Sequence, residues 1–279
     1  MWVGQQLADG LDFWGFLGSL ILGGIILGIY TGLLGYVGAK TGLSLDLLSQ
    51  RAFGEKGSYL PSAMTSFTQI GWFGVGSFVS GGTATPNFAR FAKDGKSGAI
   101  TTVVAFFIGN SLMFFFGAVS SIFVGGNDIF EVMVRLNLFY LAVLVLGLNI
   151  WTTNDNALYT AGLGLANIFH QRKKPMVLLS GIIGTVASVW LYYNFCGWLN
   201  ILNCTLPPVG MILVLAYFMN KEDFETDQPK LKTVDWFAVA GVIFGAIVAN
   251  LLHWGIASIN GMVVAAVCYC VGQAVNKRK

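Results

Sequence analysis

Long apolar stretches alternate with short polar connections along the whole chain. A helix needs about 20 apolar residues to cross a bilayer, and each stretch is long enough, or nearly so. We count roughly eight, at 13–38, 58–89, 99–125, 132–168, 176–195, 197–219, 235–254 and 255–273. The runs are continuous rather than alternating, which favours helices over a closed β-barrel. The pattern predicts an all-α polytopic membrane protein whose residues 1–279 form a single transmembrane domain.

Composition supports this fold class and narrows the function. Only 10% of the residues are charged, against about 25% in soluble domains. The 36 glycines suit close helix packing in a membrane. The spans contain no paired carboxylates, no histidine pair and no nucleophile–base arrangement, so an enzyme is not expected. No cofactor is expected either.

Basic residues gather in the connections, and cytoplasmic loops of membrane proteins are enriched in Lys and Arg. Five clusters stand out: Lys40, Arg51 and Lys56; Arg90, Lys93 and Lys96; Arg172, Lys173 and Lys174; Lys221, Lys230 and Lys232; Lys277, Arg278 and Lys279. From the second cluster onward, two apolar stretches separate each cluster from the next. This parity places them all in the cytoplasm and predicts a cytoplasmic C-terminus.

The stretch 58–89 breaks this parity, because a single crossing cannot join two cytoplasmic clusters. Either it re-enters, or one cluster lies on the other side, or spans have been lost here. Its second half, from Ser77, is rich in Gly, Ser and Thr and has little helical preference. Such a segment is a candidate for unwound backbone that faces a ligand.

A polar run lies inside the fourth apolar stretch. Between Asn149 and Asn156 the chain has three Asn, two Thr and one Asp. Polar groups in hydrocarbon are costly unless they face a bundle interior or a water-filled cavity. The run therefore predicts a binding or permeation site. Its acidic residue, Asp155, fits either a proton relay or a carboxylate satisfied by neighbouring polar groups or water.

Three residues of the run share one helix face. Asn149, Thr152 and Thr153 have the spacing i, i+3, i+4. Their side-chain oxygens could coordinate a hard monovalent cation. Hydrogen bonding between helices explains the same residues equally well, because Ser, Thr and Asn commonly have that role in membranes.

A second group of residues suits a planar, polar heterocycle. Trp72 and Phe78 offer aromatic faces, and Gln69 offers an amide for the edge of a ring. Aromatic residues at helical spacing more often serve packing, so the residues alone leave both interpretations open.

Four segments resemble the nucleobase–cation symporter family of the purine–cytosine permease type. They are Leu27-Gly-Ile-Tyr-Thr-Gly-Leu-Leu-Gly-Tyr-Val-Gly-Ala-Lys-Thr-Gly-Leu43, Gln69-Ile-Gly-Trp-Phe-Gly-Val-Gly76, Gly109-Asn-Ser-Leu-Met-Phe114 and Gly147-Leu-Asn-Ile-Trp-Thr-Thr-Asn-Asp-Asn-Ala-Leu-Tyr159. The resemblance covers nearly the whole chain. It implies a LeuT-type inverted-repeat helical bundle in the bacterial inner membrane.

The resemblance also implies a function and its residues. It implies symport of cytosine or a related nucleobase with sodium, by alternating access. It places the coupling sodium at Asn149, Thr152 and Thr153, completed by backbone carbonyls of the first span. It implies a substrate site formed by Gln69, Trp72, Ser77, Phe78, Ser80 and Asn154.

The chain departs from the family in its number of spans. The family has twelve, whereas this sequence resembles it without the start of the first span. Residues 58–76 resemble the third span and residues 77–92 the sixth, which predicts a junction of non-adjacent spans near 76–77. Restoring the intervening spans restores the parity of the basic clusters. The alternative to a working symporter is a non-transporting remnant of one.

Overall fold

The protein is helical throughout the part that the structure describes. The computed structural model describes residues 12–75, 83–125, 129–226, 229, 231–252 and 254–276. The elements are α2 (Phe13–Thr41), α3 (Leu45–Phe53), α4 (Tyr59–Val75), α5 (Pro86–Ala89), α6 (Gly95–Val104), the π-helix η2 (Ala105–Gly109), α7 (Asn110–Val124), α8 (Ile129–Arg135), α9 (Phe139–Phe169), α10 (Lys173–Tyr193), α11 (Phe195–Met219), α12 (Lys221–Glu225), α13 (Trp236–Leu251) and α14 (Ala257–Asn276). The predicted all-α class is confirmed.

Fewer helices than the eight predicted segments qualify as spans on length and apolarity. Within the described residues, five do: Phe13–Thr41, Gly95–Val124, Lys173–Leu191, Gly197–Met219 and Ala257–Val275. Helix α13 is apolar but has 16 residues. Helix α4 has 17 residues, and α9, with 31, has the polar run in its middle. The count of eight spans is therefore not confirmed.

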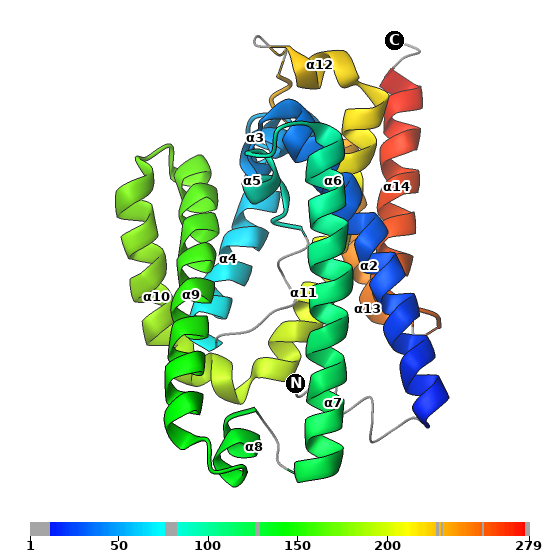
Figure 1. The fold of residues 1–279 in the computed structure, drawn as a ribbon. Helices are drawn as coiled ribbons and strands as arrows, with labels where there is room; N and C mark the ends of the chain where they lie inside the picture. The colour runs from blue at the N-terminus through cyan, green and yellow to red at the C-terminus, as the bar shows by residue number, and fades with distance from the viewer. Residues whose placement is uncertain are drawn as a thin grey trace.

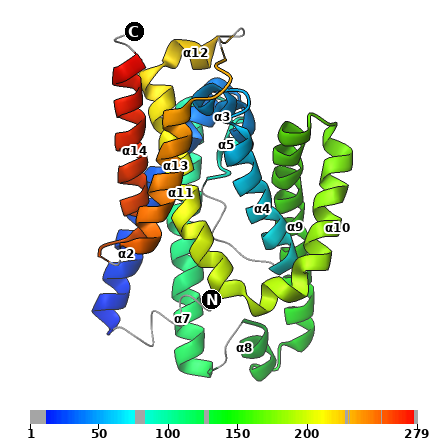
Figure 2. The same ribbon diagram turned by 180° about the vertical axis from the view of Figure 1, so that it is seen from behind.

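The basic connections lie together at one end of the molecule. Figures 1 and 2 show α3, α5, α12, the start of α6 and the turn between α9 and α10 at this end. We call it the basic end. Helix α4 starts at the basic end. Helix α5, which follows α4 in the chain, lies at the same end, since the Leu45 N–H at the start of α3 donates to Asn87 Oδ1 of α5 at 2.8 Å. The two ends of the stretch 58–89 thus lie at the same end of the molecule, as both the re-entry and the lost-span alternatives require.

Local sequence sets where several helices begin and end. The Asp12 carboxylate accepts a hydrogen bond from the Gly15 N–H at the start of α2. That helix ends at Gly42, whose φ of 67° belongs to the left-handed region that glycine adopts without strain. Asp235 caps α13 in the same way as Asp12 caps α2. Gly42 and Asp235 thus fix where α2 ends and where α13 begins at the basic end.

The predicted stretch 132–168 is two helices rather than one. Helix α8 ends at Arg135, and α9 begins at Phe139. Between them Asn137 has a φ of 59°, which ends the helical path. Pro207 and Pro208, by contrast, lie inside a continuous α11. That helix is bent rather than unwound, and Figure 2 shows its first part crossing under α4 before it turns upward.

The main apolar core lies beneath the basic end, between α2, α3, α11, α13 and α14. Its fully buried members include Leu34, Leu48, Val209, Ile212 and Phe53. Glycines let the helices approach closely around it. A Cβ on Gly245 would lie 2.7 Å from the Gly261 carbonyl oxygen, so α13 and α14 are in backbone contact there.

Candidate substrate and ion site

Three of the six predicted substrate residues, Gln69, Trp72 and Asn154, lie on the antiparallel pair α4 and α9. The two helices touch through small residues, because the Ser66 hydroxyl of α4 donates to the Ala161 carbonyl oxygen of α9 at 3.1 Å. A Cβ on Gly164 would lie 2.1 Å from Ser66 Oγ and 2.8 Å from the Ser62 carbonyl oxygen. The backbones are therefore as close as glycine permits, and the relative position of α4 and α9 is tightly defined.

Gln69 and Asn154 are on the same half of this pair. Gln69 follows Ser66 by about one turn, and Asn154 precedes Ala161 by about two turns of the antiparallel partner. Gln69 is 8% exposed, and Asn154 is half-buried. The buried Asn154 Oδ1 has no hydrogen-bond partner among the described residues. A buried acceptor of this kind suits a ligand that donates an N–H.

The remaining predicted substrate residues lie wholly or partly outside the described part of the chain. Trp72 belongs to α4, but its side chain lies outside the described part. Ser77, Phe78 and Ser80 lie outside the described residues altogether. The structure therefore places the side chains of two of the six residues, Gln69 and Asn154, on the two helices of one packed pair.

The predicted sodium ligands all lie on α9. Asn149 and Thr152 are exposed, and Thr153 is half-buried. The Thr152 hydroxyl donates to the carbonyl oxygens of Leu148 at 3.2 Å and Asn149 at 3.1 Å. A hydroxyl that donates its proton keeps its acceptor lone pairs, so this bonding is compatible with the predicted role of Thr152 as a ligand. The first-span carbonyls expected beside it belong to residues outside the described part.

A buried polar network at the basic end was not predicted from the sequence. Ser62 donates to Asp46 Oδ1 at 2.6 Å, and Gln50 Nε2 donates to Asn167 Oδ1 at 2.6 Å. Asn167 Nδ2 in turn donates to Ser58 at 3.1 Å and to Ser62 at 2.9 Å. The available signal was the four-residue spacing of Ser58, Ser62 and Ser66, which places three small hydroxyls on one helix face.

Arg90 adds a second polar connection next to this network. Its Nη2 donates to the Tyr159 hydroxyl of α9. Lys173 Nζ lies 3.4 Å from the centroid of the same tyrosine ring, and the Phe88 ring lies 6.2 Å from it. Two cations and an aromatic ring thus surround Tyr159, one turn beyond the polar run.

The comparison with protein families identifies the class. Residues 1–84 and 75–275 match the family described as permeases for cytosine/purines, uracil, thiamine and allantoin. The chain belongs to this permease family. It is a multi-pass membrane transporter rather than an enzyme.

Individual members agree with this assignment. The cytosine permease of Escherichia coli K12 is 35% identical over 372 residues, covering 100% of this chain and 88% of that protein. The allantoin permease of Bacillus subtilis 168 is 34% identical over 82 residues, which cover 29% of this chain and 16% of that protein. Mhp1, a nucleobase–cation-symport-1 family transporter solved in a closed conformation with bromovinylhydantoin bound, superimposes with a TM-score of 0.77. The superposition covers 97% of this chain and 87% of Mhp1 at 15% identity, and it confirms the predicted LeuT-type fold.

The alignment with the E. coli cytosine permease includes positions that have no counterpart in this chain. The match to the E. coli protein extends over 372 residues, whereas this chain has 279, a difference of 93. The two segments that match the family overlap at residues 75–84.

In the structure, Asp155 and Asn156 of the polar run are exposed on α9, next to exposed Thr152.

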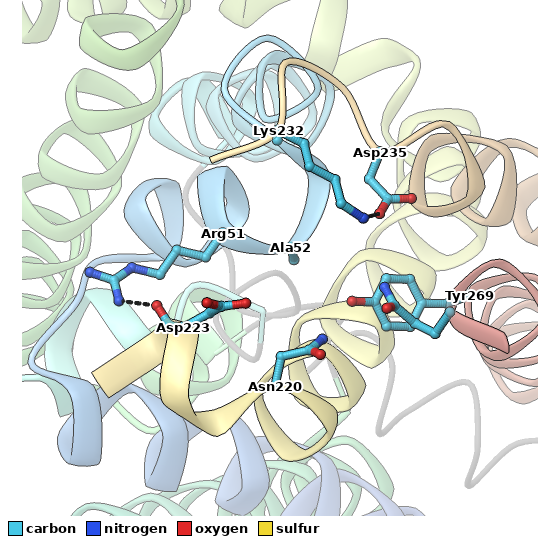
Figure 3. A pocket seen from close by; sticks show the side chains of 9 residues that line it. Arg51, Ala52, Asn220, Asp223, Lys232, Asp235 and Tyr269 are labelled. Carbon is cyan, nitrogen blue, oxygen red and sulfur yellow. Dashed lines mark hydrogen bonds and ion pairs between the residues drawn. The ribbon is translucent and has the colours of Figure 1, made fainter. Parts of the chain in front are cut away.

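A small polar cavity at the basic end is separate from the α4–α9 pair. Its volume is about 80 Å³, and Figure 3 shows Asn220, Asp235 and Tyr269 among the side chains around it. Arg51 Nη1 donates to the Asp223 carbonyl oxygen at 2.6 Å, and Lys232 Nζ pairs with Asp235 Oδ2 at 3.0 Å. Arg51 thus bonds to the main chain, Lys232 pairs with a carboxylate, and the cavity volume suits a few waters rather than a nucleobase.

Burial of Asp46 makes this end of the permease sensitive to pH. Desolvation raises the pKa of its carboxyl to about 6, although the Ser62 hydrogen bond and nearby Arg90 lower it. Between about pH 4 and pH 6, Asp46 in the folded protein therefore keeps a proton that an unfolded aspartic acid, with a pKa near 4, has lost. The stabilisation is fully present below about pH 4 and is lost as pH rises through about 6.

We expect Asp46→Asn to raise stability at pH 7.5 by on the order of 2–3 kcal/mol, because the amide keeps an acceptor for Ser62 without a buried charge. Melting temperatures in detergent at pH 5 and pH 7.5 measure the effect. The parent protein should melt at a lower temperature at pH 7.5 than at pH 5, and the variant should not show this difference. Asp94→Asn is the control, since that exposed carboxylate has its pKa lowered by the Ser97 N–H. Equal pH dependence in Asp46→Asn and the parent protein would contradict the assignment.

Proposed function

We propose that this permease carries cytosine or a closely related nucleobase together with sodium across the bacterial inner membrane. The observation that carries the proposal is the 35% identity to a cytosine permease over all of this chain. The geometry supports it. Buried Gln69 and the unpaired side-chain oxygen of Asn154 provide hydrogen-bonding groups on one helix pair, at the end of α4 where Trp72 lies.

The ion would bind on α9, one or two turns from the substrate. Asn149, Thr152 and Thr153 supply oxygens on the same helix as Asn154, so one helix contacts both ligands. Binding of each ligand would then order the same segment, which is the physical basis of coupling. Transport would proceed by alternating access within the LeuT-type bundle. In this chain, the bundle would contain a junction of non-adjacent family spans near residues 76–77.

The distribution of basic residues indicates how the protein is oriented in the membrane. The basic end carries Lys40, Arg51, Arg90 and Lys173, and such residues favour the cytoplasmic side. We therefore place the basic end, and the C-terminus that follows α14, in the cytoplasm. The turn between α10 and α11 would face the other side.

Uptake of radiolabelled cytosine into cells without their own permease tests the function. We expect sodium-dependent accumulation above the empty-vector level, and we expect Thr152→Ala combined with Thr153→Ala to remove the sodium dependence. Each variant is compared in sodium and in choline buffer at equal membrane abundance. Equal uptake in both buffers by the parent protein would exclude sodium coupling, and accumulation at the empty-vector level would exclude transport.

A further inference from the structure

The described helices form two groups. Helices α4, α9 and α10 pack on one another, and α2, α6, α11, α13 and α14 pack together beside them. Figures 1 and 2 show the first group as a separate set of helices with α3 between the groups at the basic end. At the opposite end the bent start of α11 joins them, because the Trp198 ring lies where a Cβ on Gly71 of α4 would be.

One side of α3 is apolar and packs on the second group. Leu45, Leu48 and Phe53 are at most 1% exposed and belong to the core that includes Val209 of α11 and Ala238 of α13. Backbone hydrogen bonds extend this contact. The Asp235 N–H donates to the Phe53 carbonyl oxygen at 2.6 Å, and nearby the N–H groups of residues 55–57 donate to the carbonyl oxygens of residues 232–233. Separating the apolar side of α3 from the second group would therefore expose apolar surface and also break main-chain hydrogen bonds.

The other side of α3 contacts the first group through polar side chains. Asp46 accepts from Ser62 of α4, and Gln50 donates to Asn167 of α9. Arg90 makes a parallel connection, since it follows α5, which packs on α2, and donates to Tyr159 of α9. When these contacts break, the polar groups can form hydrogen bonds with water instead, at little net cost in free energy. Separating the apolar interface would expose its surface to water with no such compensation.

We infer that these three contacts, Asp46–Ser62, Gln50–Asn167 and Arg90–Tyr159, form a releasable closure at the basic end of the transport pathway, which we call the α3 clasp. It is intact when the protein is closed at this end and broken when the pathway opens here, while the apolar side of α3 stays packed. Movement about the α11 contact at the far end permits this opening. The inference rests on the proposed transport function, since opening and closing have a purpose only in a transporter.

Reversible cross-linking tests the α3 clasp. In a cysteine-free background, Gln50→Cys with Asn167→Cys would be joined by a short bifunctional methanethiosulfonate. The matched control joins Glu55→Cys to Lys232→Cys, where the Glu55 N–H donates to the Lys232 carbonyl oxygen at 2.8 Å across the apolar side. We expect the first cross-link to reduce cytosine uptake at least about tenfold and a reductant to restore it, while the control cross-link changes uptake less than about twofold.

The outcomes separate the clasp from the proposed function. Undiminished uptake by the cross-linked Gln50–Asn167 protein, or failure of these two positions to cross-link, would overturn the α3 clasp without affecting the function. Loss of uptake in the cross-linked control as well would mean that the apolar side of α3 does not stay packed, which would also overturn the α3 clasp. Absence of uptake in the reduced proteins would count against the proposed function instead, and a second measurement then decides the clasp.

That second measurement needs no transport. Ser62 is fully buried on α4, and its hydroxyl donates to Asp46 of α3, so this position lies between the two helices. A maleimide should label Ser62→Cys in inside-out vesicles about fivefold faster, or more, when Gln50→Ala and Arg90→Ala are added, because separation of α3 from α4 admits water to this position. Ser180→Cys in α10, a buried position inside the first group, is the control and should be labelled at an unchanged rate. Equal rates at Ser62→Cys with and without the alanines would overturn the clasp.

Discussion

Replacing Gly164 by valine is expected to prevent α4 from packing on α9, whereas the same change at Gly147 of the same helix should leave the fold intact. A Cβ on Gly164 would meet Ser66 Oγ at 2.1 Å and the Ser62 carbonyl oxygen at 2.8 Å. The hydroxyl could rotate away, but the carbonyl belongs to the helix backbone and cannot. Valine adds two further methyl groups, so we expect a loss of about 3 kcal/mol or more.

Gly147 is the matched control because a Cβ there meets nothing within 4 Å. Both positions are inside α9, so the intrinsic helix preference of valine over glycine contributes equally to both. Melting of the purified proteins by fluorescence-detected size exclusion measures the difference. Similar melting temperatures for the two variants would show that α4 and α9 are further apart than the structure places them.

Replacing Asn154 by alanine should weaken nucleobase binding about 10- to 100-fold, since an unpaired buried polar group costs about 1–3 kcal/mol. The physical reason is that Asn154 Oδ1 is buried and has no partner among the described residues. A ligand N–H that bonds to it in the parent protein would have no acceptor in the variant. Binding of radiolabelled cytosine to the purified protein, with sodium present, measures the loss.

Asn156→Ala provides the comparison. It is the same substitution two residues along α9, at a side chain that is exposed on a different face of the helix. We expect its affinity for cytosine to stay within about twofold of the parent protein. If both variants bound cytosine as well as the parent, Asn154 would not be a substrate ligand.

The sequence was sufficient to predict what depends on neighbouring residues. Continuous apolar runs predicted the helical class, and the concentration of polar residues at 149–156 predicted the helix that carries the candidate site. The basic clusters predicted which connections share an end of the molecule. Each of these is a property of composition or spacing within one segment, so no knowledge of tertiary contacts was needed.

Features that depend on contacts between distant segments could not be predicted. Gln50 and Asn167 are 117 residues apart, and each alone reads as an ordinary polar residue near a helix end. Asp46 is an unremarkable aspartate in the sequence, and only burial against Ser62 gives it an unusual pKa. The division of the stretch 132–168 rests on the left-handed conformation of Asn137, which an apolar count does not detect.

The polar run of α9 also bears on how the protein is made. Helix α9 is not among the described helices that qualify as spans, whereas α10, which follows directly, is. During synthesis, the translocon releases a segment into lipid according to its apolarity, and Asn154, Asp155 and Asn156 at the middle of α9 oppose that release. Helix α4 is synthesised first and packs on both α9 and α10. We therefore expect α9 to enter the membrane together with α10, as a hairpin that packs on α4, because the polar run of α9 opposes its integration alone.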